Sequence, residues 1–183
     1  MQRKIRLATA DFYGSVKELF ERLSCNDFCL FQVNEKPDLI VFSGGADISP
    51  SIYGERNYAS HVNPARDAWE TTVYTYAVEN HIPCLGICRG HQLLNALSGG
   101  KLVQNITDSH PGIHNLVSEL FPIVVNSYHH QGVVSTPLEV LAMYKDIAEI
   151  TFGNNIFSVQ FHPEFDTDRD MDEVVKKGLE MLW

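Results

Sequence analysis

The fold is decided by residues 82–90, which read IPCLGICRG. Residues 82–87 form an apolar run that is typical of a parallel strand buried on both faces, and residues 89–97 have the apolar spacing of a helix. Gly99 and Gly100 follow that helix and suit a left-handed C-terminal cap. The stretch therefore predicts a strand, a sharp turn at Cys88 and a helix.

The alternation of strand and helix continues on both sides of this stretch. The loop Ser43-Gly44-Gly45 ends an apolar run that we expect to be a central parallel strand. The expected strands are residues 5–8, 38–42, 123–126, 148–152 and 156–161, and the expected helices are residues 15–23, capped by Ser15, 67–80 and 171–182. This order predicts an α/β fold, a three-layer α/β/α sandwich with a mostly parallel sheet.

Composition narrows the class of protein. With 183 residues, 44% apolar and 20% charged, the chain is expected to form a single globular domain over residues 1–183. Its 23 acidic residues against 14 basic ones give a formal charge of −9, which disfavours nucleic acid as a partner. Because no apolar run reaches about 20 residues and the N-terminal segment lacks an export signal, we expect a cytoplasmic protein that does not bind membranes.

The cysteines and histidines do not follow a recognised metal-site spacing. The four cysteines form two pairs at i,i+4 and are expected to be free thiols: Cys25, Cys29, Cys84 and Cys88. Four histidines could suggest zinc, but no third ligand joins them at a known spacing: His110, His114, His129 and His130. We therefore expect no metal and no cofactor.

Cys88 has the surroundings of a nucleophile. A side chain between a strand end and a helix start is exposed at the carboxyl edge of the sheet, and Gly86 and Gly90 let neighbouring backbone approach closely. The N–H groups of a helix start favour a thiolate and offer donors to an oxyanion. A buried structural cysteine is the alternative, and it suits the other three cysteines better than Cys88.

The tripeptide His162-Pro163-Glu164 offers a base and a group that orients it. The i,i+2 spacing can project His162 and Glu164 from one side of an extended segment, which Pro163 stiffens. Since the ends of parallel strands converge on one edge of a sheet, His162 is expected to meet Cys88 there.

GICRGHQ at residues 86–92, with HPE at 162–164, resembles the class I glutamine amidotransferases, a Cys-His-Glu family with a flavodoxin-like fold. The resemblance covers nearly the whole chain. It implies that Cys88 attacks the γ-carbonyl of a glutamine or γ-glutamyl group to form a thioester. By the same resemblance, His162 relays the proton to the leaving amine and Glu164 orients His162.

The resemblance also implies a set of groups around the substrate. The backbone N–H groups of Gly45 and Arg89 form the oxyanion hole, and Gln92 helps to hold the glutamyl group. The substrate's α-amino and carboxylate groups are expected to bind backbone groups of a segment after a strand: Tyr128, His129 and His130.

Three segments resemble the γ-glutamyl hydrolase branch, particularly the γ-glutamyl-γ-aminobutyrate hydrolases: SGGADISP at residues 43–50, Arg66-Asp67 with Glu70, and NSYHHQ at residues 126–131. Synthetase-bound glutaminases usually have proline where this chain has Ala46. Compared with those hydrolases, the segment over residues 101–122 looks short. Arg66, Asp67 and Glu70 fit a solvated helix face as well as an ion pair or a substrate contact.

Two functions follow from the resemblance. The first is a hydrolase that releases glutamate and an amine from a small γ-glutamyl amide. The second is a glutaminase subunit that delivers ammonia to a separate synthetase, since the chain has no GxxxxGK[ST] loop for ATP. A non-enzymatic binding module is weakened by the presence of all three catalytic residue types. A synthetase partner and a homodimer both stay open.

Overall fold

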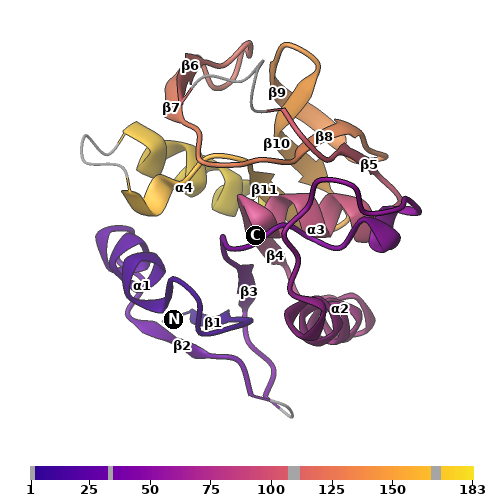
Figure 1. Cartoon of the computed structure of the whole chain (residues 1–183). Coiled ribbons are helices and arrows are strands. Elements are labelled where there is room, and N and C mark those ends of the chain that lie inside the picture. The colour runs from indigo at the N-terminus through magenta and orange to yellow at the C-terminus, as the bar shows by residue number, and fades with distance from the viewer. Residues whose placement is uncertain (1–2, 33–34, 107–111, 166–169) are drawn as a thin grey trace.

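The computed structural model describes residues 3–32, 35–106, 112–165 and 170–183. A seven-stranded sheet in the order β2-β1-β3-β4-β11-β10-β9 runs through the molecule (Figure 1). The strands are β1 (Lys4–Leu7), β2 (Asp27–Leu30), β3 (Leu39–Phe42), β4 (Cys84–Ile87), β9 (Glu139–Tyr144), β10 (Ile147–Gly153) and β11 (Ile156–Val159). The first five in this order are parallel, and β10 and β9 add an antiparallel edge.

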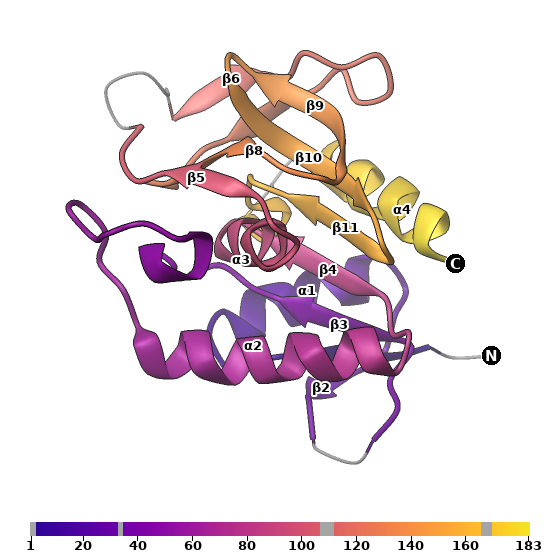
Figure 2. The same cartoon turned by 90° about the vertical axis from the view of Figure 1, so that its right-hand side faces the viewer.

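Two pairs of helices cover the two faces of this sheet. Helices α1 (Tyr13–Arg22) and α4 (Asp170–Leu182) lie on one face, and α2 (Pro64–Glu79) and α3 (Arg89–Leu97) lie on the other (Figures 1 and 2). Each face has its own apolar core. The α/β three-layer architecture that the sequence predicts is therefore confirmed. Among the described residues, no helix has the length and apolar character needed to cross a membrane.

Short elements complete the structure around the main sheet, and the sequence predicts few of them. They are β5 (Lys101–Val103) paired with β8 (Gly132–Ser135), β6 (Ile113–Asn115) paired with β7 (Val124–Asn126), and the 3-10 helices η1 (Pro50–Tyr53) and η2 (Pro163–Phe165). Figure 2 shows the two small sheets on the β9 side of the molecule. Strands of three or four residues carry too little periodicity to be found from the sequence.

The expected helix at residues 89–97 is confirmed with the same bounds, and Gly99 after it has the left-handed φ of 99° that its glycine permits. The expected cap at Ser15 is wrong. Helix α1 begins at Tyr13, and its N-cap is Phe12, which has φ 58° and makes no side-chain cap bond. Helix α2 begins earlier than expected, at Pro64, because the Asn63 side chain accepts the N–H of Arg66 and caps it.

The start of α3 is pressed against the sheet. A Cβ atom on Gly90 would lie 2.0 Å from the carbonyl oxygen of Phe42, and one on Gly86 would lie 2.8 Å from the backbone of Gly90. His91 anchors the same helix turn, since its two ring nitrogens lie 2.8 Å from Ser158 Oγ and 3.0 Å from Ala148 O. Burial lowers the pKa of His91 to about 4, so this ring is neutral near pH 7.

We expect Gly90→Ala to lower the free energy of unfolding by about 2–3 kcal/mol, because the added methyl group meets backbone that cannot move aside. The measurement is the midpoint of denaturant unfolding. Gly14→Ala is the matched control: its Cβ meets nothing within 4 Å, and alanine inside helix α1 should stabilise it by about 0.5–1 kcal/mol. Equal midpoints for the two variants would contradict the close contact at Gly90.

Candidate active site

Cys88 lies on the sharp turn that joins β4 to α3. Its backbone has φ 50° and ψ −103°, an uncommon conformation for a residue with a side chain, and its surface is 4% exposed. The neighbouring strands hold this turn, since the Cys88 N–H donates to the carbonyl of Val159 at 2.9 Å. Strain of this kind is common where a protein must place a reactive group.

His162 follows β11, the strand that pairs with β4, and therefore lies beside Cys88. Its Nδ1 is 2.7 Å from Glu164 Oε1. Burial lowers the pKa of His162, but the charge of Cys88, a hydrogen bond with that sulfur and the contact with Glu164 together raise it to about 10. The site thus places a cationic imidazole between a sulfur and a carboxylate.

Glu164 reaches His162 by a different route from the one expected. The segment is not extended: Pro163 begins the 3-10 helix η2, and the N–H of Phe165 donates back to the carbonyl of His162 at 3.2 Å. The fixed φ of proline fits this tight turn. The carboxylate is therefore brought round to the imidazole by the turn rather than by strand alternation.

Asn126, at the end of β7, fixes the backbone of His162. Its Nδ2 donates to the carbonyl of His162 at 2.9 Å, and its Oδ1 accepts the N–H of His162 at 2.8 Å. From the sequence, Asn126 is only the first residue of the segment NSYHHQ and has no predicted role of its own. The two partners are 36 positions apart in the sequence, so no local signal records this contact.

A hollow of about 240 Å³ opens beside Cys88. It is lined by Gly45, Ala46, Asp47, His61, Cys88, Gln92, Tyr128, His129 and His130. All the expected substrate contacts thus meet at one place, and Arg89 is the next residue after Cys88. The Gln92 side chain is buried, and its Nε2 donates to Gln131 O and Gln160 Oε1, each at 3.1 Å.

The segment after β7 is held by its own side chains. His129 Nδ1 lies 2.8 Å from Gln131 O, and His130 Nδ1 lies 3.1 Å from Asp47 Oδ2. Gln131, which has no predicted role from the sequence, is fully buried and bonds both the N–H and the carbonyl of Ile48 at 3.1 Å. These contacts tie the segment to the loop that carries Asp47.

Gly45 lies in the loop after β3, where its φ of 148° suits glycine alone. A Cβ atom on Gly45 would lie 2.1 Å from Arg66 Nη1, so the guanidinium packs directly against this backbone. Arg66 Nη2 donates to the carbonyl of Ser43 at 3.0 Å, and its Nη1 lies 2.6 Å from Asp11 Oδ2.

Glu70 connects this arginine to the one beside Cys88. One oxygen of the fully buried Glu70 accepts from Arg66 Nε at 3.0 Å, and the other accepts from Arg89 Nη1. Arg89 Nη2 also contacts Asp67, whose second oxygen accepts the Ser49 hydroxyl at 2.6 Å. Arg66, Asp67 and Glu70 thus belong to a buried ion network. Of the alternatives that the sequence left open for them, the solvated helix face is wrong.

Comparison with known proteins agrees with this fold and shows the family of the chain. The profile of the peptidase C26 family matches residues 29–120. The chain belongs to the peptidase C26 family. Peptidase C26 is a class I glutamine amidotransferase-like family, so the family expected from the sequence is confirmed.

Relatives within this class carry two kinds of name. The chain is 34% identical to the glutamine amidotransferase-like protein YvdE of Lactococcus lactis over 155 residues, 69% of this chain and 66% of that protein. It is 29% identical to the γ-glutamyl-γ-aminobutyrate hydrolase PuuD of Escherichia coli, over 75% of this chain and 68% of that protein. For the first relatives, the chain spans between about half and two thirds of their length.

Solved structures agree on the fold of this peptidase C26 chain. A protein from Thermoplasma acidophilum, named as one of the subunits of a GMP synthase, superposes with a TM-score of 0.74 at 18% identity, covering 100% of this chain and 94% of that one. A glutamine amidotransferase from Thermotoga maritima gives 0.67 at 16% identity, covering 99% of this chain and 85% of that one.

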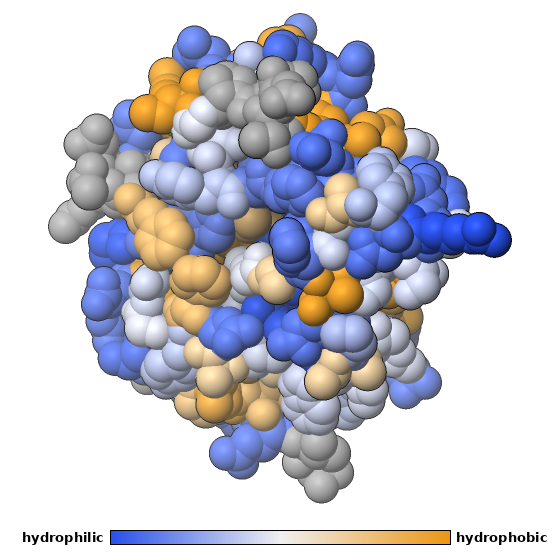
Figure 3. All heavy atoms as spheres, viewed as in Figure 1, coloured by the Kyte–Doolittle hydropathy of each residue, from blue (hydrophilic) through white to orange (hydrophobic). Residues whose placement is uncertain are grey.

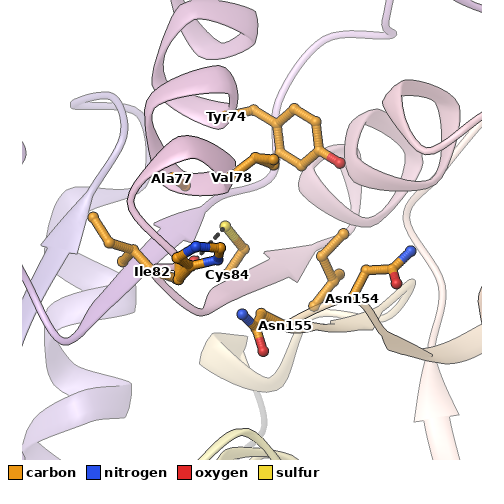
Figure 4. Close-up of a pocket in the computed structure, with 9 residues that line it drawn as sticks. Tyr74, Ala77, Val78, Ile82, Cys84, Asn154 and Asn155 are labelled. Carbon is orange, nitrogen blue, oxygen red and sulfur yellow. Dashed lines mark hydrogen bonds between the residues drawn. The ribbon is translucent and has the colours of Figure 1, made fainter.

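A larger hollow of about 400 Å³ lies at the other end of β4 and does not share the chemistry of this site (Figure 4). Its cysteine, Cys84, is buried and close to the carbonyl of Ile82. Burial raises the pKa of Cys84 to about 12, so it stays a thiol near pH 7. The turn residues Asn154 and Asn155 form the opposite wall.

The histidines that suggest zinc from the sequence do not gather into a metal site in the described residues. His110 lies outside them. In the part of the chain that the structure describes, no group of three or more His, Cys, Asp or Glu side chains is placed to hold a metal ion.

We expect Glu70→Gln to lower the free energy of unfolding by about 3 kcal/mol, because each of two buried guanidinium groups would lose one of the two carboxylates that balance it. Denaturant unfolding at pH 7 measures this. Glu21→Gln removes a carboxylate from an exposed pair with Lys17 and should leave the midpoint nearly unchanged. A Glu70→Gln midpoint as high as that of Glu21→Gln would show that the network contributes little to stability.

Proposed function

We propose that this peptidase C26 protein is a cysteine-dependent hydrolase that cleaves γ-glutamyl amides and releases glutamate and an amine. The observation that carries the proposal is the alignment of Cys88, His162 and Glu164 at the end of two paired strands, beside a hollow. The γ-glutamyl-γ-aminobutyrate hydrolases among the relatives support the choice of a γ-glutamyl bond.

In the proposed first half-reaction, the Cys88 sulfur attacks the γ-carbonyl carbon of the substrate. The carbon–sulfur bond forms as the carbonyl electron pair moves to oxygen. When that pair returns, the carbon–nitrogen bond breaks, and the His162 imidazolium gives its proton to the leaving nitrogen. The products are a γ-glutamyl thioester on Cys88, a neutral imidazole and a free amine.

In the second half-reaction, the neutral His162 takes a proton from water, whose oxygen attacks the thioester carbon. The carbon–sulfur bond breaks and glutamate leaves, which restores the sulfur and the imidazolium. Glu164 keeps the Nδ1 side of the ring occupied at 2.7 Å, so Nε2 is the nitrogen that serves both steps.

The negative oxygen of each tetrahedral intermediate is proposed to lie between the N–H groups of Gly45 and Arg89. Gly45 lines the hollow, and Arg89 is the first residue of α3, where the N–H has no partner within the helix. Glu70 joins the side chains of Arg66 and Arg89, so it acts as a positioning residue for both donors.

The glutamyl end of the substrate is proposed to occupy the rest of the hollow. Backbone groups of Tyr128, His129 and His130 would hold its α-amino and carboxylate groups. The Gln92 side chain would contact the glutamyl group of the substrate. The hydrogen bonds of His129 and His130 to Gln131 and Asp47 keep this segment in place without a substrate.

The second candidate is a glutaminase subunit that passes ammonia to a synthetase. The fold similarity to a protein named as one of the subunits of a GMP synthase favours it. A panel of glutamine and γ-glutamyl amines separates the two functions. Faster glutamate release from an amine conjugate than from glutamine indicates the hydrolase, and glutamine turnover that appears only with a synthetase indicates the subunit.

We expect Cys88→Ala to abolish glutamate release. Its free energy of unfolding should stay within about 1 kcal/mol of that of the parent, because the turn does not need the sulfur. Cys29→Ala, on edge strand β2, is the matched control and should keep full activity. Glutamate release is measured enzymatically. Turnover retained by Cys88→Ala would remove the nucleophile.

We expect Glu164→Gln to move the alkaline limb of activity to lower pH. In the parent, the pKa of His162 is about 10, so the proton needed by the leaving amine is present below that pH and lost above it. His162 also stabilises the fold below its unfolded pKa of about 6.5, and this contribution disappears as the pH rises through about 10. Removing the Glu164 charge lowers the pKa of His162, so both the activity and the stabilisation by His162 should be lost at a lower pH than in the parent.

The measurement is kcat/KM for one γ-glutamyl amide between pH 6 and 11. Glu173→Gln, which removes an exposed carboxylate on α4, is the control and should keep the parent profile. An alkaline limb at the same pH in Glu164→Gln and the parent would show that Glu164 does not set the charge of His162.

A further inference from the structure

Three exposed aromatic rings surround the imidazole of His162. Phe165 stacks on it with ring centroids 5.0 Å apart and an angle of 16° between the planes. The ring centroids of Tyr128 and Phe12 lie 5.9 and 6.0 Å from that of the imidazole, and both rings also contact Phe165. We call Phe12, Tyr128 and Phe165 the aromatic rim; their exposed fractions are 38%, 69% and 42%.

Phe12 occupies its place in the rim at a cost to the fold. It is the N-cap of α1, has φ 58° and ψ 20°, and gives the helix no side-chain cap bond. Asn or Gly would adopt this left-handed backbone more easily and would cap the helix better. A bulky apolar side chain that is strained, exposed and next to a reactive histidine indicates a role in binding rather than in folding.

The aromatic rim adjoins the place where the leaving amine must be. Tyr128 lines the hollow beside Cys88 and also contacts His162, so the rim continues the wall of that hollow. Since His162 gives its proton to the leaving nitrogen, that nitrogen comes within hydrogen-bond distance of the imidazole. Its substituent then lies against the rings that surround the imidazole.

The surface at this place is apolar. Figure 3 shows apolar side chains beside the central hollow, over the start of α1. The cation–ring contacts found in the described residues are elsewhere, at Trp183, Tyr144 and Phe121.

In the part of the chain that the structure describes, two cations near the rim already have carboxylate partners. The imidazolium of His162 is paired with Glu164, and the guanidinium of Arg66 is paired with Asp11, the neighbour of Phe12. A carboxylate on the leaving amine would therefore lose water at the rim without gaining an unpaired cation from these described residues. An apolar chain would release water from the rings.

We propose that the aromatic rim binds the substituent of the leaving amine, and that the preferred substrate is a γ-glutamyl amide of a primary amine with an apolar chain. This inference rests on the proposed γ-glutamyl chemistry of Cys88. It adds the class of leaving group, which the site residues around Cys88 leave open.

The test compares two amides that differ in one group. γ-Glutamyl-n-butylamide and γ-glutamyl-γ-aminobutyrate have the same four-carbon chain, and only the second ends in a carboxylate. We expect kcat/KM to be about tenfold higher for the butylamide, the discrimination that one or two methylene groups give in an apolar site. A value for γ-glutamyl-γ-aminobutyrate equal to or above that of the butylamide overturns the proposal.

Variants of Phe12 connect the preference to the rim. Phe12→Asn suits the left-handed backbone and removes the apolar surface, whereas Phe12→Leu keeps an apolar side chain. The readout is the ratio of kcat/KM for butylamide to that for γ-glutamyl-methylamide within each variant, so a general loss of activity cancels. The ratio should fall at least threefold in Phe12→Asn and by less in Phe12→Leu.

Leu120→Asn removes an exposed apolar side chain outside the rim and should keep the parent ratio. An unchanged ratio in Phe12→Asn overturns the proposal, because the rings would then only shield His162 from water. Labelling of Cys88 by a glutamine-like chloroketone tests the chemistry separately. If the chloroketone labels Cys88 but no amide is turned over, the readout is how strongly each amide slows this labelling. Stronger protection by the butylamide than by γ-glutamyl-γ-aminobutyrate supports the proposal, and the reverse order overturns it. Without labelling or turnover, the proposed function itself fails.

Discussion

The contact between the start of α3 and the sheet is the constraint on which the site depends. Gly90 lets the first turn of the helix lie against the backbone of Phe42, and Gly86 lets strand β4 lie against Gly90. With side chains at these positions the helix would have to move outward, and Cys88 would no longer sit at the carboxyl edge in its strained conformation. The neighbouring His91 holds the same turn by two hydrogen bonds.

Around this turn, buried charged side chains hold backbone that lacks regular secondary structure. The loop at Gly45 has no regular structure, yet the guanidinium of Arg66 packs against it and bonds the carbonyl of Ser43. Glu70 joins Arg66 to Arg89 in a region without solvent. A buried charge is costly to leave unpaired, so these partners specify one geometry more strongly than apolar packing would. The buried imidazole of His162 is held in a similar way, because its interactions with Cys88 and Glu164 favour the charged form.

The wall of the site is less regular than its base. The base is built from the ends of β4 and β11, whereas the aromatic rim beside the hollow comes from the segment after β7, the 3-10 helix η2 and the residue before α1. These three segments are far apart in the sequence and meet through ring contacts with His162. In the function that we propose, the position of Cys88 depends on the sheet, and the choice of leaving group depends on the surrounding loops.

The sequence was enough to predict the four helices, five strands of the main sheet, the turn at Cys88 and the family, because these follow from local apolar runs and from glycines at a fixed spacing. It did not predict the edge strands β2 and β9, most of the short strands, the start of α1 at Tyr13 or the turn that carries Glu164. The contacts of Glu70 with two arginines and of Asn126 with His162 are evident only in the folded chain. Those contacts join residues up to 36 positions apart, and no local pattern records which distant side chains the sheet brings together.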